Sequence, residues 1–300
     1  MKRDEKCPLL IKADEEAGHY QYITREDGGW PYLNFAARQL PRGNTWVGNT
    51  GNHEYAIVLL SGNYRVNTDK GSWQTGNGRR DVFSGMAHTL YLPRHTTFRL
   101  IAESDVLDIA YGWCETDRDF DPVFKRPEEV QIEIRGGDNA TRQINDLLGP
   151  GFPCHRLVAV EVYTPSGNWS SFPAHKHDER LVDAAGTLLE ARLEETYFYK
   201  IAKPQGYAMQ RVYTSDGSLD EVAIARNNDV VLVPRGYHPV VAGHGYDVYY
   251  LNFLAGSDQS LANTPDPDHA WIFGTWTGTD ERIPMVTAAM NGKEQRDENI

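Results

Sequence analysis

Short strand-like segments recur along the whole 300-residue chain. They are separated by glycine, proline and asparagine, and little sustained helical periodicity accompanies them. Clear examples in the first half are residues 54–60, 62–66, 88–92, 97–101 and 106–111. The pattern therefore predicts an all-β protein made of short strands.

The second half repeats this rhythm. Residues 88–95 and 229–238 both contain a strand that ends in Pro-Arg and is soon followed by a histidine. We therefore expect two tandem barrels. The expected division is an N-terminal barrel at 1–120, a linker with a strand and a short helix at 121–150, a C-terminal barrel at 151–290 and a frayed tail at 291–300. The helix is expected at 141–148, capped by Asn139 or Thr141 and ended by Gly149-Pro150.

Composition limits the possible partners. A hydrophobic fraction of 40% is enough for one large or two modest cores. A formal net charge of −12 argues against a nucleic-acid surface, which needs clustered lysine and arginine. No apolar stretch approaches the roughly 20 residues that cross a bilayer, and the start lacks a signal-peptide core. We expect a cytoplasmic protein with no nucleic-acid or membrane partner.

His175 and His177 are one residue apart in the segment 173–178. In an extended strand, such residues point to the same face, so both imidazoles can reach one metal ion. A carboxylate follows at Glu195, which starts an aromatic strand. His238 comes just past a strand that ends in a Pro-x-Gly turn. Three histidines and one carboxylate are thus available.

Two other residues compete for these roles. Glu179 stands two residues after His177 and has the parity of a ligand, but it begins a charged segment, so we favour Glu195. His244 is a rival fourth ligand in a glycine-flanked loop. Mixed imidazole and carboxylate ligation suits one divalent Zn, Mn, Fe or Ni ion, and the ligands alone do not select among them.

The order His-x-His, Glu, then Pro-x-Gly and His resembles the two metal motifs of the cupin superfamily. That resemblance implies antiparallel double-sheet barrels and a divalent metal held by three histidines and one glutamate. Cupins place the glutamate nearer to the second histidine, so residues 178–192 are interpreted as an inserted loop. The first half contains His53, His88 and His95 but no His-x-His, and we expect its barrel to bind no metal.

Longer stretches of the chain resemble the 5-deoxyglucuronate isomerases of bacterial myo-inositol catabolism. These stretches are residues 29–34, 136–144, 164–178, 194–199 and 230–239. The resemblance implies aldose–ketose isomerisation of a small uronate, 5-deoxy-D-glucuronate, to 5-dehydro-2-deoxy-D-gluconate, and a homo-oligomer. The alternatives are a ketol-isomerase acting on a pectin-derived 4-deoxy-uronate, an iron-dependent cupin dioxygenase, and a sugar-binding barrel without catalysis.

Several residues are candidates for the chemistry. Glu161 is a charged residue in an apolar strand, and we expect it to be the general base. Arg142 and Arg211 are candidates for binding a substrate carboxylate, and the strand around Arg211 favours the latter. The hydroxyl of Tyr250, together with those of nearby strand tyrosines, is expected to orient the sugar.

Overall fold

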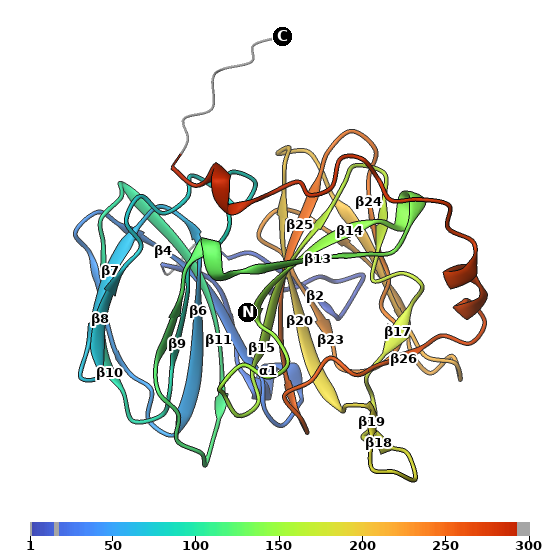
Figure 1. Cartoon of the computed structure of the whole chain (residues 1–300), viewed down its shortest axis with the longest axis horizontal. Helices are drawn as coiled ribbons and strands as arrows, with labels where there is room; N and C mark the ends of the chain where they lie inside the picture. The colour runs from blue at the N-terminus through green and yellow to red at the C-terminus, as the bar shows by residue number, and fades with distance from the viewer. Residues whose placement is uncertain (1, 15–17, 293–300) are drawn as a thin grey trace.

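The structure is a computed structural model that describes residues 2–14 and 18–292. Its regular structure is almost entirely antiparallel β-sheet, and the one α-helix in this part of the chain is the single turn α1 (Arg25–Gly28). The prediction of an all-β fold with two tandem double-sheet barrels is confirmed, and Figure 1 shows the barrels side by side. Most of the predicted frayed tail lies outside the described residues.

The first barrel consists of a six-stranded and a four-stranded sheet. The six-stranded sheet has the order β12-β9-β6-β11-β4-β3, with bounds Val123–Lys125, Thr89–Leu92, His53–Ser61, Val106–Glu115, Asn34–Pro41 and His19–Ile23. The four-stranded sheet has the order β5-β10-β7-β8, with bounds Thr45–Asn49, Thr97–Ala102, Tyr64–Thr68 and Gly71–Gln74. Buried apolar side chains such as Ile57, Leu100 and Ile109 fill the space between the two sheets.

The second barrel has an eight-stranded and a four-stranded sheet. The larger has the order β1-β2-β23-β20-β25-β15-β14-β13, with bounds Lys2–Arg3, Leu10–Lys12, Val230–Val233, Leu193–Ile201, Val248–Gly256, Val158–Thr164, Arg142–Leu148 and Gln131–Arg135. The smaller has the order β16-β24-β21-β22, with bounds Trp169–Ser170, Val240–Ala242, Ala208–Tyr213 and Asp220–Ala225. Two short ladders complete it: β17 (His175–Lys176) with β26 (Thr264–Pro265), and β18 (Leu181–Val182) with β19 (Leu188–Glu190).

The two large sheets pack against each other and form the core between the barrels. Phe35 and Ala110 of the first barrel share one buried apolar cluster with Phe198 and Phe253 of the second. Gly112 is required at this contact, because a Cβ there would lie 2.5 Å from Cδ1 of Phe253. Each large sheet is therefore buried on both faces, one face lining its own barrel and the other lining the core between the barrels.

Buried polar side chains also join the two barrels. Glu54 accepts hydrogen bonds from the backbone N–H groups of residues 155–157, and Glu194 accepts from those of Tyr32 and Leu33. Lys200 pairs with Asp108 at 2.8 Å. These bonds satisfy groups that burial would otherwise leave unpaired, so the arrangement of the barrels is specific.

Two predicted boundaries differ from the structure. Residues 2–12 do not belong to the first barrel, because Leu10 and Ile11 pair with Val231 and Val230 of β23. Residues 142–148 form strand β14 rather than a helix. They lie between β13 and β15 and hydrogen-bond to both, and this pairing outweighs the local helix-cap and stop signals.

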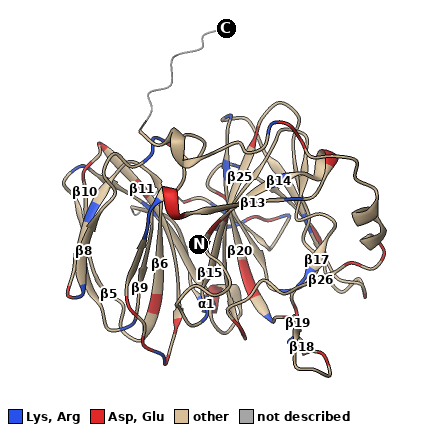
Figure 2. Cartoon of the chain, viewed as in Figure 1, with Lys and Arg blue, Asp and Glu red and all other residues tan. Residues whose placement is uncertain are grey.

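Charged residues of both signs are intermingled in both barrels (Figure 2). Within the described residues, no helix has the length and apolar character needed to cross a membrane.

Candidate metal centre

Three buried side chains converge inside the second barrel. His177 follows β17, Glu195 lies on β20, and His238 lies in the turn after β23. Their potential ligand atoms all lie within 4.8 Å of one another. Glu195 Oε2 is 3.0 Å from His177 Nε2 and 3.3 Å from His238 Nε2.

Backbone carbonyls fix the orientation of both imidazoles. His177 Nδ1 lies 3.0 Å from the carbonyl oxygen of Leu193, and His238 Nδ1 lies 2.8 Å from that of Gly236. A carbonyl oxygen can only accept, so each Nδ1 donates a proton, and in its neutral form each ring directs the lone pair of its Nε2 toward Glu195. His238 Nε2 is buried and has no hydrogen-bond partner. Two nitrogen lone pairs facing a carboxylate are a donor set that fits a divalent cation.

His175 lies at the more exposed side of this group. Its ring centroid is 4.9 Å from that of His238, and the His177 centroid is 5.0 Å from the same ring. The predicted common face of the two histidines is thus present in the structure. Burial, with the nearby imidazoles, lowers the pKa of His175 well below its usual value, which keeps the ring neutral.

The structure separates the two candidate carboxylates. Glu179 is exposed, and its backbone N–H donates to Glu190. Glu190 also accepts from the backbone N–H of Asp178 and pairs with Lys176 at 3.0 Å, so it fastens the residues on both sides of His177 to β19. The inserted loop contains the small β18–β19 ladder, and the chain returns to the site at Glu195. His244 is exposed in a loop after β24 and is not part of the cluster.

The conformation of the turn that carries His238 explains why residue 236 is a glycine. Gly236 has φ of 92°, and a Cβ there would lie 2.5 Å from the carbonyl oxygen of Tyr213. Its N–H donates to Asp178 Oδ1 at 2.7 Å. Asp178 thus ties the His238 turn to the segment that carries His177, a role that sequence reasoning missed.

A chain of hydroxyl groups runs beside the histidines. Tyr197 Oη is 3.1 Å from Ser171 Oγ, which is 3.4 Å from Tyr250 Oη. Tyr250 Oη is also 2.9 Å from Ser170 Oγ. Burial raises the pKa of Tyr250, so its hydroxyl is protonated at neutral pH. Tyr250 belongs to the buried cluster inside the second barrel.

Two predicted catalytic residues point away from this site. Glu161 is wrong as the general base, because it faces the core between the barrels and pairs with Arg79 at 2.6 Å. Its neighbours Val160 and Val162 face the barrel instead. Arg211 is wrong as the carboxylate clamp, because its side chain is 47% exposed and pairs with Asp220 outside the barrel. Each of these strands has one face toward the barrel interior and one away from it. Alternation in the sequence separates the two faces but does not identify the one that lines the barrel.

The other arginine candidate does lie near the site. Arg142 is 8% exposed, and its Nη1 donates to the carbonyl oxygen of Phe172 at 3.1 Å. Phe172 lies three residues before His175. Burial lowers the pKa of the Arg142 guanidinium, and its charge acts on Tyr250.

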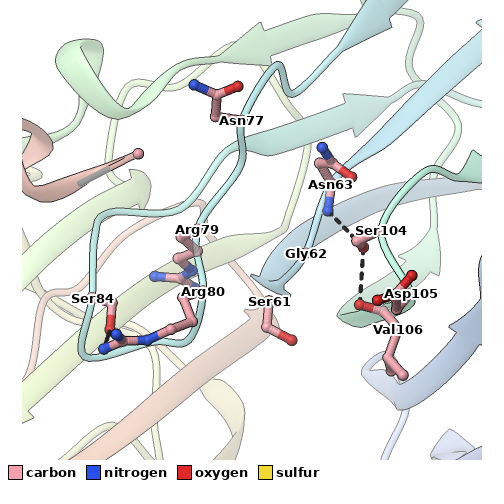
Figure 3. Close-up of a pocket in the computed structure, with 11 residues that line it drawn as sticks. Ser61, Gly62, Asn63, Asn77, Arg79, Arg80, Ser84, Ser104, Asp105 and Val106 are labelled. Carbon is pink, nitrogen blue, oxygen red and sulfur yellow. Dashed lines mark hydrogen bonds between the residues drawn. The ribbon is translucent and has the colours of Figure 1, made fainter. Parts of the chain in front are cut away.

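A surface pocket of about 810 Å³ lies elsewhere, at the edge of the first barrel (Figure 3). Ser61, Asn63, Arg79 and Ser104 are among the residues that line it. Arg79 is already committed to Glu161, and Ser104 bonds to the backbone of Asn63 and Val106. None of the clustered histidines lines this pocket, so it is not the candidate metal centre.

Comparison with known proteins identifies the family to which the chain belongs. A model described as the KduI/IolB family matches residues 9–272. The chain is 38% identical over 258 residues to a protein named 5-deoxy-glucuronate isomerase from Geobacillus thermodenitrificans (strain NG80-2), covering 86% of this chain and 92% of that protein. It is 33% identical over 252 residues to the protein of the same name from Bacillus subtilis (strain 168), covering 83% and 91%.

Solved structures agree with the fold. An IolB-like protein from Salmonella typhimurium LT2 superposes with a TM-score of 0.82 at 37% identity, covering 88% of this chain and 98% of that one. The Bacillus subtilis oxalate decarboxylase, in a study of its Mn(II) centres, superposes with a TM-score of 0.59 at 14% identity, covering 88% and 81%. At that identity, the second likeness concerns the fold alone.

Proposed function

Because the chain belongs to the KduI/IolB family, we propose that it is a metal-dependent isomerase that converts 5-deoxy-D-glucuronate to 5-dehydro-2-deoxy-D-gluconate in myo-inositol catabolism. One observation supports a chemical rather than a purely sugar-binding role: two imidazole lone pairs and a carboxylate meet inside the second barrel. Relatives named for this activity align over most of the chain. As an enzyme of sugar catabolism, it would act in the cytoplasm.

His177, Glu195 and His238 would hold one divalent ion, with His175 as the fourth ligand from the more exposed side. Zn, Mn, Fe and Ni all accept this ligand set. When bound, such an ion supplies Lewis acidity, which polarises a carbonyl and lowers the pKa of a neighbouring hydroxyl. The first barrel would bind no metal and would serve as a scaffold.

The chain's own hydroxyl groups would handle the proton. Isomerisation moves one hydrogen from C2 to C1 and one proton from the C2 hydroxyl to the former carbonyl oxygen, so nothing is gained or lost. Tyr250, Ser171 and Tyr197 form a hydrogen-bonded series in which each hydroxyl can both donate and accept. Held in a buried site, this series would orient the sugar hydroxyls and carry the proton between oxygens.

Metal analysis tests the ligand set. Pure protein carrying His175→Ala, His177→Ala or His238→Ala should contain much less metal than the unaltered chain. Glu195→Gln should also lose the ion, whereas Glu179→Gln, the matched control in the exposed segment, should retain it. Unchanged metal content in the three histidine variants would contradict the proposed centre.

Turnover in deuterated water tests the reaction. The metal-loaded enzyme should isomerise 5-deoxy-D-glucuronate with or without oxygen, and turnover that required oxygen would indicate a dioxygenase. Deuterium at the product carbon indicates proton transfer, and its absence indicates a hydride shift. Preference for a pectin-derived 4-deoxy-uronate would move the assignment to that ketol-isomerase, and failure with both acids would reject the proposed activity.

We also propose that the chain forms a homo-oligomer, as sequence resemblance implied. Light scattering or analytical ultracentrifugation should give a mass that is a multiple of 33.9 kDa. A monomer at micromolar concentration would contradict this proposal.

A further inference from the structure

Arg142 is a buried cation without an anionic partner. Arg142 is only 8% exposed. Among the described residues, its side chain makes one hydrogen bond, which it donates to the carbonyl oxygen of Phe172 at 3.1 Å. No aspartate or glutamate in the described part of the chain forms an ion pair with it. Arg79 is more deeply buried than Arg142, and it does have an anionic partner, because it pairs with Glu161 at 2.6 Å.

The position of Arg142 directs it to the interior of the second barrel. It begins β14 and shares a face with Ile144, which packs against the barrel core that contains Tyr197 and Tyr250. Across the ladder, Ile144 pairs with Val162, another residue of that core. Arg142 and the metal cluster therefore lie on the same inner surface of the large sheet.

The surrounding chain leaves room for the guanidinium. Gly136 has φ of 80°, and a Cβ there would lie 3.0 Å from Arg142 Nη1 and 2.0 Å from the carbonyl oxygen of Ala140. A larger residue at 136 would thus crowd the charged group. The Phe172 carbonyl engages only one of the five N–H donors of the guanidinium.

Burying such a cation is costly. The charged form loses hydration on entering the protein, and one neutral carbonyl does not replace a counter-charge. A carboxylate can accept two parallel hydrogen bonds from the guanidinium, a geometry that lysine does not reproduce. The site is therefore built for an anion that the protein itself does not supply.

We propose that Arg142 binds the carboxylate of the uronate substrate and makes the enzyme select an acid over a neutral sugar. This inference rests on the proposed function, since the sugar acid is its ligand. The metal cluster receives the carbonyl end of the substrate, while Arg142 fixes the opposite end and so sets which carbon faces the hydroxyl series.

Calorimetric titration of the metal-loaded protein tests this role with two probes of nearly equal shape, D-glucuronate and the neutral D-glucuronamide. The unaltered protein should bind the acid more tightly. Arg142→Gln should lose at least about 30-fold in affinity for D-glucuronate, with little change for the amide. The affinity of Arg142→Lys for D-glucuronate should lie between those of the unaltered protein and Arg142→Gln. Arg211→Gln changes an exposed arginine and serves as the control, so it should bind both probes as the unaltered protein does.

The outcomes separate this inference from the proposed function. If the unaltered enzyme turns over 5-deoxy-D-glucuronate but Arg142→Gln keeps its preference for the acid, Arg142 is not the anion site. If Arg142→Gln loses affinity for both probes and also loses its metal, the Arg142 side chain has a structural role and the inference also fails. If the unaltered protein neither binds nor converts any uronate, the proposed function fails, and the inference fails with it.

Discussion

Replacing Glu161 by glutamine should destabilise the fold and leave the metal centre intact. Glu161 and Arg79 are both fully buried in the core between the barrels, with 2.6 Å between Oε1 and Nη2. Tyr249 also donates to Glu161 Oε1 at 3.0 Å. Burial alone would lower the pKa of Arg79, but the Glu161 charge raises it, so the guanidinium stays charged.

The size of the effect follows from what remains after the substitution. In Glu161→Gln, the Arg79 guanidinium stays in the core without a counter-charge, and removal of one partner of a buried pair typically costs about 3–5 kcal/mol. Arg79→Met should cost a similar amount. The double variant should lose less than the sum of the two, by about 0.5–3 kcal/mol, because neither charge is then left alone.

Urea unfolding followed by tryptophan fluorescence measures these losses, with metal content and kcat determined on the same samples. Arg211→Gln breaks a pair whose side chains are 47% and 50% exposed, so as a control it should cost less than about 1 kcal/mol. Two results would refute this account: Glu161→Gln as stable as the unaltered protein, or a hundredfold loss of kcat at full stability and metal content. The second would restore Glu161 as a catalytic base.

Three further predictions concern other parts of the molecule. Tyr250→Phe should lower kcat by at least about tenfold while metal is retained. The hydroxyl of Tyr199 bonds to Gln210 at 2.8 Å, so Tyr199→Phe, the control, should have a smaller effect on kcat. Equal effects of the two substitutions on kcat would argue against a special role for Tyr250. Burial and the nearby Arg79 charge lower the pKa of His88 from 6.5 to about 4, so the unfolded chain binds its proton more readily. The stability that neutral His88 contributes should therefore be complete above pH 6.5 and decline by at most about 3 kcal/mol as the pH falls to 4, and urea titrations of His88→Asn should show a shallower decline. Deletion of residues 2–12 should destabilise the second barrel rather than the first, because it removes β2 from β23, and limited proteolysis that first cut the first barrel would contradict this.

Strand alternation in the sequence was enough to predict the class of fold and much of the candidate metal centre. It placed His175 and His177 on one face, and it offered Glu195, at the start of a strand, as the carboxylate. In the structure, Glu195 approaches two histidines, and Glu194 binds the backbone of the first barrel. Alternation is informative here because neighbouring residues of a strand point in opposite directions whatever the strand packs against.

Only the tertiary structure decided which face of each strand lines the barrel. Glu161 and Arg211 both occupy strands, yet one faces the core between the barrels and the other faces solvent. The pairing of β2 with β23 and the strand at 142–148 likewise depend on partners distant in sequence. Period-two alternation defines two faces without saying what covers them, and each large sheet is buried on both sides, so a buried polar residue can belong to either side.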